Sequence, residues 1–223
     1  MTRYQTLLLD LDDTVYPASS GVWELIGERI NRFMIDVVGI DAERAPALRR
    51  LYFERYGTSL NGLRIHHGVD PFDYLRFVHD LPLEDYLSPD PLLRRMLEGL
   101  ALPPVIFTNA DAAHARRVLS ALGVADLVDR FIDIVALGWV NKPQPEAYRR
   151  ALKICGQEDP AACIVVDDQP RNLIAAAALG MGTVLVGSAE RLDGIDHAIP
   201  RASDLLAAVP DLARGRSRPL PHD

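Results

Sequence analysis

Carboxylate side chains cluster at two places in the sequence, each directly after a short apolar run. Asp10, Asp12 and Asp13 lie in the string LLLDLDDT, and Asp167 and Asp168 end the string CIVVDD. Three carboxylates so close together repel one another, which raises their pKa values unless a cation offsets the charge. A hard cation such as Mg²⁺ prefers oxygen ligands and would also neutralise an incoming phosphate group. Either string alone could be a turn or a helix cap, but the two together indicate a shared metal site.

Three further side chains could hold a phosphate group. Thr108 and Asn109 follow the apolar run PVIF and offer a hydroxyl, an amide and backbone N–H groups beside a helix start, where the helix dipole favours anions. Lys142 precedes Pro143 just before another predicted helix, and its charge could pair with the acidic cluster and a phosphate oxygen. Each feature alone is ordinary, because such residues also cap helices or lie in solvent. Combined with the carboxylates, they meet the needs of phosphoryl transfer: nucleophile, charge neutralisation and positioning.

These groups follow the predicted strands of an α/β fold. Short apolar runs bounded by turn residues predict strands at 4–10, 104–110, 130–137, 163–168 and 183–187. The helices predicted between them are 111–122, with Asp111 as its N-cap, 144–155 and 170–180. This alternation predicts a Rossmann-like three-layer core with a mainly parallel sheet. Ligands bind at the carboxyl ends of the strands in such sheets, so we expect the chemical groups to meet there.

The stretch from Val15 to about Ser88 breaks this alternation. It reads as several amphipathic helices, for example 22–37 and 44–56, and contains no convincing strand pattern. Because it is far too long for a simple loop, we predict a helical cap domain inserted after the first strand, over the mouth of the site. The predicted domains are a core of residues 1–15 and 88–212, a cap of residues 16–87, and a flexible tail of residues 213–223.

Composition narrows the class of protein. A formal charge of -7 disfavours binding to a nucleic acid polymer, which depends on clustered Lys and Arg. The N-terminal apolar run has only three leucines, so we expect no signal peptide, no membrane partner and a cytoplasmic location. Cys155 and Cys163 do not suggest a disulfide framework. Composition leaves monomer and homodimer equally open.

With these motifs in order, the chain resembles the haloacid dehalogenase-like hydrolase superfamily over nearly its whole length. Its four motifs are matched by Asp10 with Asp12, by Thr108, by Lys142, and by the aspartates that end CIVVDD. More narrowly, the strings DLDDTVYP, YGTSLNGLR, VIFTNAD, NKPQPEAY and VDDQPRN resemble the pyrimidine 5'-nucleotidase branch. The resemblance implies an α/β core with a cap and a Mg²⁺-dependent phosphatase.

The resemblance also implies a role for each matched residue. Asp10 would attack phosphorus to form an aspartyl-phosphate, while Asp12 would protonate the leaving oxygen and later activate the hydrolytic water. Mg²⁺ would be held by the Asp10 side chain, the Asp12 backbone carbonyl and Asp168, with Asp167 nearby or one layer further out. Thr108 and Lys142 would hold phosphate oxygens, and Asn109 would add backbone donors.

Specificity is expected to come from the insertion. Its string YGTSLNGLRIHH contains Tyr56, Arg64 and His67, polar and aromatic groups that could read a nucleobase or a sugar. Each of them could equally be solvated or packed within the cap. We expect the substrate to be a small phosphorylated metabolite, first a nucleoside 5'-monophosphate with a pyrimidine base.

Three other functions remain open at this point. The catalytic core does not depend on the leaving group, so a broad phosphatase for sugar phosphates or phosphoglycolate is the main alternative. A haloacid dehalogenase is less favoured, because it needs neither magnesium nor an acid, and Asp12 and Asp168 are both present. A catalytically silent binding protein gains no support, because every catalytic position of the superfamily is filled.

Overall fold

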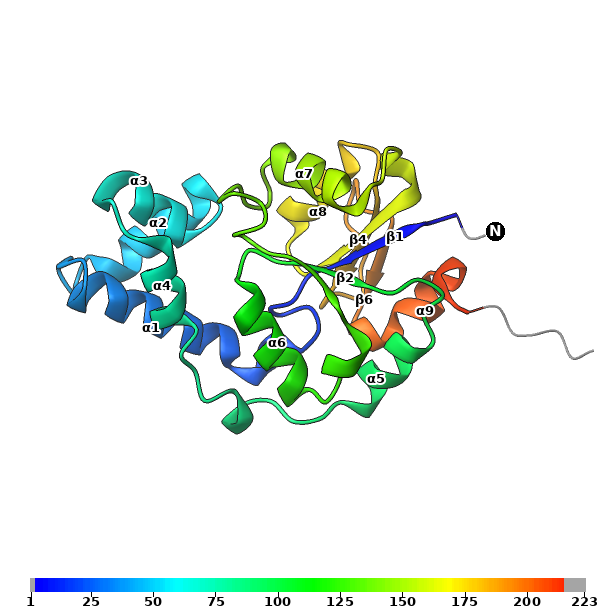
Figure 1. The fold of residues 1–223 in the computed structure, drawn as a ribbon, viewed down its shortest axis with the longest axis horizontal. Helices are drawn as coiled ribbons and strands as arrows, with labels where there is room; N and C mark the ends of the chain where they lie inside the picture. Colours follow the sequence, from blue (N-terminus) through cyan, green and yellow to red (C-terminus); the bar gives the residue numbers. More distant parts are fainter. Residues whose placement is uncertain (1–2, 215–223) are drawn as a thin grey trace, which may run out of the picture.

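The centre of the molecule is one parallel six-stranded sheet (Figure 1), seen in a computed structural model that describes residues 3–214. The strands are β1 (Thr6–Leu9), β2 (Val105–Phe107), β3 (Arg130–Ile132), β4 (Cys163–Asp167), β5 (Gly182–Val186) and β6 (His197–Ile199). Their order is β3-β2-β1-β4-β5-β6, and every neighbouring pair is parallel. The central strands are buried along almost their whole length, as expected when helices cover both faces of a sheet.

Nine α-helices and six single 3₁₀ turns surround this sheet in the described part of the chain. The α-helices are α1 (Val22–Asp36), α2 (Ala45–Tyr56), α3 (Ser59–His67), α4 (Pro71–Val78), α5 (Pro91–Glu98), α6 (Ala112–Ala121), α7 (Pro145–Cys155), α8 (Pro170–Ala177) and α9 (Leu205–Ala208). The 3₁₀ turns are η1 (Ala18–Ser20), η2 (Leu83–Asp85), η3 (Ala125–Leu127), η4 (Pro160–Ala162), η5 (Ala202–Asp204) and η6 (Pro210–Leu212).

Two separate hydrophobic clusters show that the core has three layers. Successive side chains of a strand point to opposite faces of the sheet. Leu8 of β1 therefore packs in the cluster that contains Tyr148 of α7, whereas Leu7 and Leu9 pack in the cluster that contains Val118 of α6. In Figure 1, α7 and α8 lie above the sheet, and α5, α6 and α9 lie below it. The predicted Rossmann-like fold is confirmed.

The helical insertion after β1 is also confirmed. Residues 15–88 contain no strand, and α1 to α4 form a group at one side of the core, at the left of Figure 1. We call this group the cap. α5 follows it but packs on the core against η5 and η3. The exact domain boundaries stay predictions.

The last described residue, Arg214, is hydrogen-bonded to the core. Arg214 donates from its backbone N–H to the carbonyl of Gly99 at 2.8 Å, and from Nε to the carbonyl of Leu100 at 2.8 Å. Packing therefore extends to the end of the described residues, two positions into the tail predicted at 213–223. The rest of that tail, residues 215–223, lies outside the described residues.

The strand predicted at 130–137 is too long, because β3 ends at Ile132. Asp133 turns the chain there: its carboxylate accepts hydrogen bonds from the backbone N–H groups of Ala136 at 2.7 Å and Ala112 at 2.9 Å. A side chain that satisfies backbone groups in this way offers the chain an alternative to a sheet ladder. The apolar run after Asp133 therefore does not form a strand, although its composition predicted one.

The helix cap predicted at Asp111 is confirmed. The Asp111 side chain caps α6 by accepting from the backbone N–H of His114 at 2.7 Å. Cys155 and Cys163 are both free thiols. No helix among residues 3–214 has the length and apolar character needed to cross a membrane.

Candidate active site

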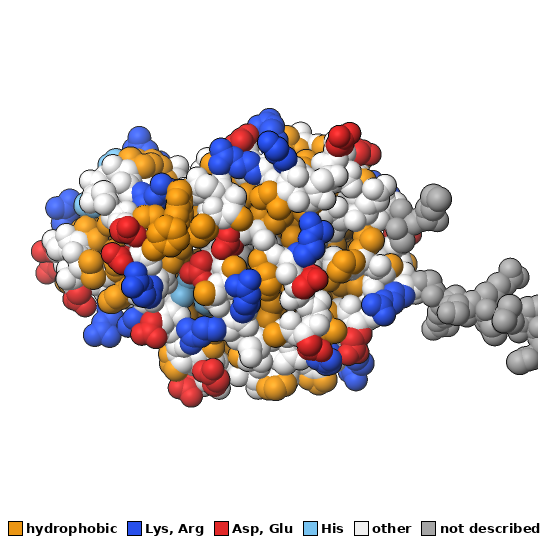
Figure 2. All heavy atoms as spheres, viewed as in Figure 1, with side chains coloured by type: hydrophobic (Ala, Val, Ile, Leu, Met, Phe, Trp, Pro, Cys, Tyr) orange, Lys and Arg blue, Asp and Glu red, His pale blue; other side chains and the backbone are white. Residues whose placement is uncertain are grey.

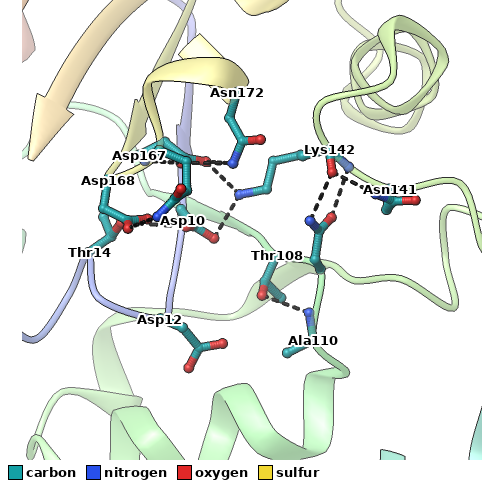
Figure 3. Close-up of polar contacts among 12 residues, drawn as sticks. Asp10, Asp12, Thr14, Thr108, Ala110, Asn141, Lys142, Asp167, Asp168 and Asn172 are labelled. Carbon is teal, nitrogen blue, oxygen red and sulfur yellow. Dashed lines mark hydrogen bonds and ion pairs between the residues drawn. The ribbon is translucent and has the colours of Figure 1, made fainter. Parts of the chain in front are cut away.

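The two acidic strings meet at the carboxyl edge of the sheet (Figure 3). β1 and β4 are neighbours, and the chain runs outward from β1 in one direction and from β4 in the other, which makes this a topological switch point. Asp10 directly follows β1, Asp167 ends β4, and Asp168 comes next. One carboxylate oxygen from each of the three lies within 4.8 Å of the others. The predicted convergence of the carboxylates is confirmed.

A buried lysine lies inside this cluster. Nζ of Lys142 is 2.7 Å from Oδ1 of Asp10 and 2.7 Å from Oδ2 of Asp167. Only 2% of the Lys142 side chain is exposed, so both ion pairs are shielded from solvent. Two of the three carboxylates contact this one ammonium group, so the cluster contains more acidic groups than cations. Hard oxygen donors in such excess suit a divalent cation.

The pKa values reflect the crowding of charge. Burial raises the pKa of Asp10 well above its usual range, Lys142 opposes this, and the two neighbouring carboxylates raise it further. Burial and the nearby charge of Asp167 raise the pKa of Asp168 to about 6. Burial acts to lower the pKa of Lys142, but Asp10 and Asp167 outweigh it and raise the pKa, so the ammonium form persists. A bound cation would offset the repulsion that these shifts express.

Asp167 is the most fully bonded of the three carboxylates. Besides Lys142, it accepts hydrogen bonds from Nδ2 of Asn172 at 2.9 and 3.1 Å and from the backbone N–H of Gln169 at 2.8 Å. Asp10 and Asp168 are less occupied, and the Thr14 hydroxyl lies between them at 3.4 and 3.5 Å. Their oxygens are therefore the more available ligands, and Asp167 serves mainly to anchor Lys142.

The loop that carries Lys142 is held from its backbone. Oδ1 of Asn109 accepts from the backbone N–H of Lys142 at 2.8 Å, and Nδ2 of Asn109 donates to its carbonyl at 3.1 Å. Nδ2 of Asn141 donates to the same carbonyl at 2.6 Å. The Asn109 side chain is thus used to place Lys142. Thr108 is 1% exposed, and its hydroxyl accepts from the backbone N–H of Ala110 at 3.0 Å.

Asp12 lies apart from the cluster around Lys142, as Figure 3 shows. Its Oδ1 accepts a hydrogen bond from the Tyr16 hydroxyl at 2.6 Å and lies 3.0 Å from Nε2 of His114. Burial acts to raise the pKa of Asp12, but His114 and the Tyr16 hydroxyl outweigh it and lower the pKa. Asp10 and Asp12 therefore lie in different electrostatic surroundings.

A cavity of about 270 Å³ lies between the core and the cap. On the core side it is lined by Asp10, Asp12, Thr108, Asn109, Lys142 and Asp168. On the cap side it is lined by residues that include Trp23, Arg49 and Phe53. In Figure 2, acidic side chains and a histidine are visible where the cap meets the core. All of the predicted core residues except Asp167 thus line one cavity that the cap covers.

The three cap residues predicted for specificity have other partners. The Tyr56 hydroxyl lies 2.6 Å from Nε2 of His66, and Nε2 of His67 lies 2.9 Å from the Tyr52 hydroxyl. The Arg64 guanidinium donates to Asn61 at 2.9 Å and lies over the ring of Trp139. None of the three predicted residues is among those that line the cavity.

The cavity is lined instead by residues that the sequence patterns did not indicate. Trp23 is 41% exposed and lies edge-on to Phe53, with ring centroids 6.4 Å apart. The Arg171 guanidinium lies 3.9 Å from the centroid of the Phe53 ring. Nε of Arg49 is buried without a hydrogen-bond partner among the described residues. The cap wall therefore combines aromatic faces with cationic groups.

Other missed residues act on the carboxylates themselves, namely Thr14, Tyr16, His114 and Asn172. Thr14, Tyr16 and Asn172 are four or five positions from the aspartates they bond, a spacing that could have raised them as candidates. His114 is different, because it comes from α6 and reaches Asp12 only through the packing of that helix on the sheet.

A second cavity, of about 400 Å³, reaches Asp168 from another side. Its lining includes Asp13 and Asp168, together with Arg201 from the segment after β6. Asp13 and Asp168 also line the cavity under the cap. Asp168 of the acidic cluster is therefore accessible from two directions.

The sequence is similar to one family profile and to curated relatives. A family profile described as "Hydrolase: haloacid dehalogenase-like hydrolase" matches residues 4–180. Phosphate metabolism protein 8 of Saccharomyces cerevisiae is 31% identical over 195 residues, which cover 81% of this chain and 61% of the yeast protein. The chain spans about half to three fifths of the length of the curated relatives it matches.

Solved structures share the fold at low sequence identity. A HAD phosphatase from Thermococcus onnurineus has a TM-score of 0.57 and 20% identity, covering 91% of this chain and 96% of that chain. The HAD-hydrolase YfnB from Bacillus subtilis, solved with bound magnesium, has a TM-score of 0.57 and 16% identity, covering 92% of this chain and 98% of that chain. These similarities concern the arrangement of helices and strands.

Proposed function

The chain belongs to the haloacid dehalogenase-like hydrolase family, and on that premise we propose that it hydrolyses a small phosphomonoester with Asp10 as nucleophile. The observation that carries the proposal is the position of Lys142, buried between Asp10 and Asp167 at 2.7 Å from each. Such an ammonium group can hold the nucleophile in place and attract a phosphate dianion at the same time. The name of the yeast relative, a phosphate metabolism protein, agrees with this proposal.

The reaction proceeds in two steps. An oxygen of Asp10 forms a bond to phosphorus, and the phosphorus–oxygen bond of the ester breaks. The leaving oxygen keeps the bonding electron pair and takes a proton from Asp12. In the second step water attacks the aspartyl-phosphate, Asp12 accepts a proton from it, and inorganic phosphate is released while Asp10 is restored. Thr108 and Lys142 line the cavity beside Asp10, where they hold phosphate oxygens.

Magnesium is the cofactor that the site fits. The ion would be held by the side chains of Asp10 and Asp168 and by the backbone carbonyl of Asp12. Asp167 would lie next to these ligands. The support is the triad of carboxylates and its excess of acidic groups over cations, together with the magnesium bound by YfnB on the same fold. When bound, the ion supplies charge neutralisation for the phosphate group in the transition state.

For the substrate we propose a nucleoside 5'-monophosphate, with pyrimidine bases favoured. Trp23 and Phe53 offer aromatic faces in the cavity wall on which a base can stack. Arg49 also lines the cavity, and its guanidinium offers donors for an oxygen of the substrate. A broad phosphatase for sugar phosphates or phosphoglycolate is the alternative, because the same guanidinium could bind a carboxylate or a sugar hydroxyl.

A dehalogenase is less well supported. Release of a halide ion needs no proton, whereas release of an alkoxide needs an acid close to the leaving oxygen. Asp12 lines the cavity and is bonded through one carboxylate oxygen by two donors. A carboxylate held by two hydrogen bonds agrees better with ester hydrolysis than with dehalogenation.

Location and assembly stay predictions. We propose a cytoplasmic monomer or homodimer whose partner is a small phosphorylated metabolite. On the face shown in Figure 2, positive and negative side chains are interspersed, which agrees with the expectation that no nucleic acid polymer is bound.

The test is phosphate release from nucleoside monophosphates, sugar phosphates and phosphoglycolate, with and without magnesium. Asp10→Asn is the inactive variant, and Asp193→Asn, an exposed loop residue, is the matched control. Magnesium-dependent release that is strongest with UMP or CMP, and absent only in Asp10→Asn, would support mechanism and substrate together. Release by Asp10→Asn at the wild-type rate would refute the mechanism, and equal rates across the panel would refute the nucleotide preference.

A further inference from the structure

The two oxygens of the Asp12 carboxylate have unequal surroundings. The Tyr16 hydroxyl donates to Oδ1 at 2.6 Å, and Nε2 of His114 lies 3.0 Å from the same oxygen. Among residues 3–214, Oδ2 has no hydrogen-bond partner. The carboxylate lines the cavity beneath the cap and is 13% exposed. One oxygen is therefore held by the protein, and the other is left for a ligand.

His114 is placed to act as a donor. Its side chain is fully buried, and its Nδ1 has no partner among the described residues. When the acidic proton is carried on Oδ2, Oδ1 is only an acceptor, so the Nε2–H of His114 donates to Oδ1. Two donors from different elements, the turn after β1 and helix α6, thus fix the rotation of the carboxylate about its Cβ–Cγ bond.

A residue of the cap covers the other side of His114. The ring of His79, which directly follows α4, stacks on the ring of His114 with centroids 4.2 Å apart and an interplanar angle of 18°. Nδ1 of His79 lies 2.9 Å from Oδ2 of Asp111. Arg117 of α6 donates to the carbonyls of His79 at 2.8 Å and of Leu81. The end of the cap is therefore fastened to the helix that presents His114.

We propose that Tyr16 and His114 are positioning residues that hold Oδ1 of Asp12, so that Oδ2 is directed at the leaving oxygen of the substrate, and that His79 extends this arrangement into the cap. This inference rests on the proposed function, in which Asp12 is the acid. A general acid must come within hydrogen-bond distance of the oxygen it protonates. Loss of a positioning bond lets the carboxylate rotate, and small misplacements of a reacting group lower rates strongly.

The test uses the dependence of kcat/KM on the leaving group, measured in wild type and in Tyr16→Phe, His114→Phe and His79→Ala. The substrates are 2,4-dinitrophenyl phosphate, whose leaving group needs no proton, 4-nitrophenyl phosphate, and the best alkyl phosphate from the panel. For His114→Phe we expect kcat/KM to fall about 10²-fold with the alkyl phosphate and less than about threefold with the dinitrophenyl ester. Tyr16→Phe and His79→Ala should show the same selectivity with smaller losses.

A conservative variant and a control complete the design. In His114→Gln, the side-chain amide can donate to Oδ1, so alkyl phosphate turnover should recover to within about tenfold of wild type. His197→Gln, on the edge strand β6, should match wild type with every ester. A purely structural role for His114 has no reason to depend on the leaving group.

The outcomes separate the inference from the function on which it rests. Equal losses with all three esters, or no loss with any, would overturn the positioning role while leaving the phosphatase proposal intact. Selectivity in His114→Phe without any in His79→Ala would overturn the link to the cap. Absence of turnover in wild type, or full turnover in Asp10→Asn, would overturn the proposed function and this inference with it.

Discussion

The ammonium group of Lys142 lies 2.7 Å from a carboxylate oxygen of Asp10, although the two residues belong to distant parts of the chain. Asp10 follows the central strand β1, and Lys142 lies in the segment between β3 and α7. Both side chains are buried, so neither charge is tolerable without the other. The same ion pair therefore contributes to the stability of the core and to the arrangement of the site.

Replacing Lys142 is expected to destabilise the fold as well as to stop catalysis. Lys142→Met leaves buried carboxylates without their cation, and breaking a buried ion pair costs about 3–5 kcal/mol. The loss in the free energy of unfolding should be largest at pH 8 and shrink toward pH 4, where the carboxylates become protonated. Urea unfolding at both pH values with a chelator present measures this. Lys153→Met, on the exposed face of α7, is the control, and an equal loss in both variants would contradict the prediction.

Magnesium is expected to stabilise the folded protein through Asp168. A ligand that binds only the folded state adds about 2.7 kcal/mol at a concentration one hundred times its Kd. Wild type should therefore show a rise in Tm as magnesium is added, and Asp168→Asn should show little or none. Differential scanning calorimetry with magnesium and with a chelator makes the comparison, and Asp193→Asn should behave as wild type. An unchanged rise in Asp168→Asn would remove this residue from the ligand set.

Asp13 is expected to lower stability as pH rises. Burial and the nearby charges of Asp168 and Asp12 raise its pKa to about 7, above the value near 3.9 of an unfolded chain. A carboxyl group whose folded pKa is raised contributes stability below pH 4 and loses it as pH rises toward 7.

Asp13→Asn removes this dependence, and Asn also tolerates the left-handed backbone at this position, where φ is 56°. In metal-free buffer the variant should match wild type at pH 4 and exceed it above pH 7 by the order of 1 kcal/mol, after allowance for solvent screening. Chemical unfolding from pH 4 to 8 checks this, with Asp129→Asn as the exposed control. A constant difference across that range would show that another cause is responsible.

The cap residues that line the cavity are not the ones that the sequence patterns indicate for substrate specificity. Trp23→Ala and Arg49→Met should raise KM for the preferred nucleotide by about tenfold, because each removes a contact of the order of 1.4 kcal/mol. Tyr56→Phe and His67→Gln should change KM less than about twofold, since neither side chain lines the cavity. Steady-state kinetics with UMP and phosphoglycolate decides between the two sets. A larger effect at Tyr56 or His67 would restore the sequence-based assignment.

The core of the site was predictable because most of its residues lie at the ends of strands, and the local sequence pattern indicates those strands. Asp10 and Asp167 each directly follow a short apolar run, and such runs form parallel strands whose carboxyl ends share one edge of the sheet. Knowing the strands was enough to bring the aspartates and Thr108 to one edge of the sheet, and Lys142 reaches them from the segment between β3 and α7. The error at residues 133–137 has the same origin, because an apolar run carries no sign of the hydrogen bonds that Asp133 makes to the backbone.

The cap residues were not predictable in this way. Which side of a helix faces a cavity depends on how the helix is rotated about its axis, and each residue turns the direction by about 100°. In α2, Arg49 and Phe53 face the cavity while Tyr56 turns toward His66, although all three lie on the same short helix. That rotation is determined by packing against α1 and α3, which no local pattern in α2 records.

The amino-acid sequence by itself thus determined the order of strands and helices and the carboxylate, threonine and lysine groups that gather at the edge of the sheet. Only the tertiary structure decided which cap side chains face the cavity and that His114 of α6 lies within hydrogen-bond distance of Asp12. The physical reason is the range of the interactions involved. Strand ends are set by the chain's own apolar and polar pattern, whereas the direction of a helical side chain is set by contacts with residues far away in the sequence.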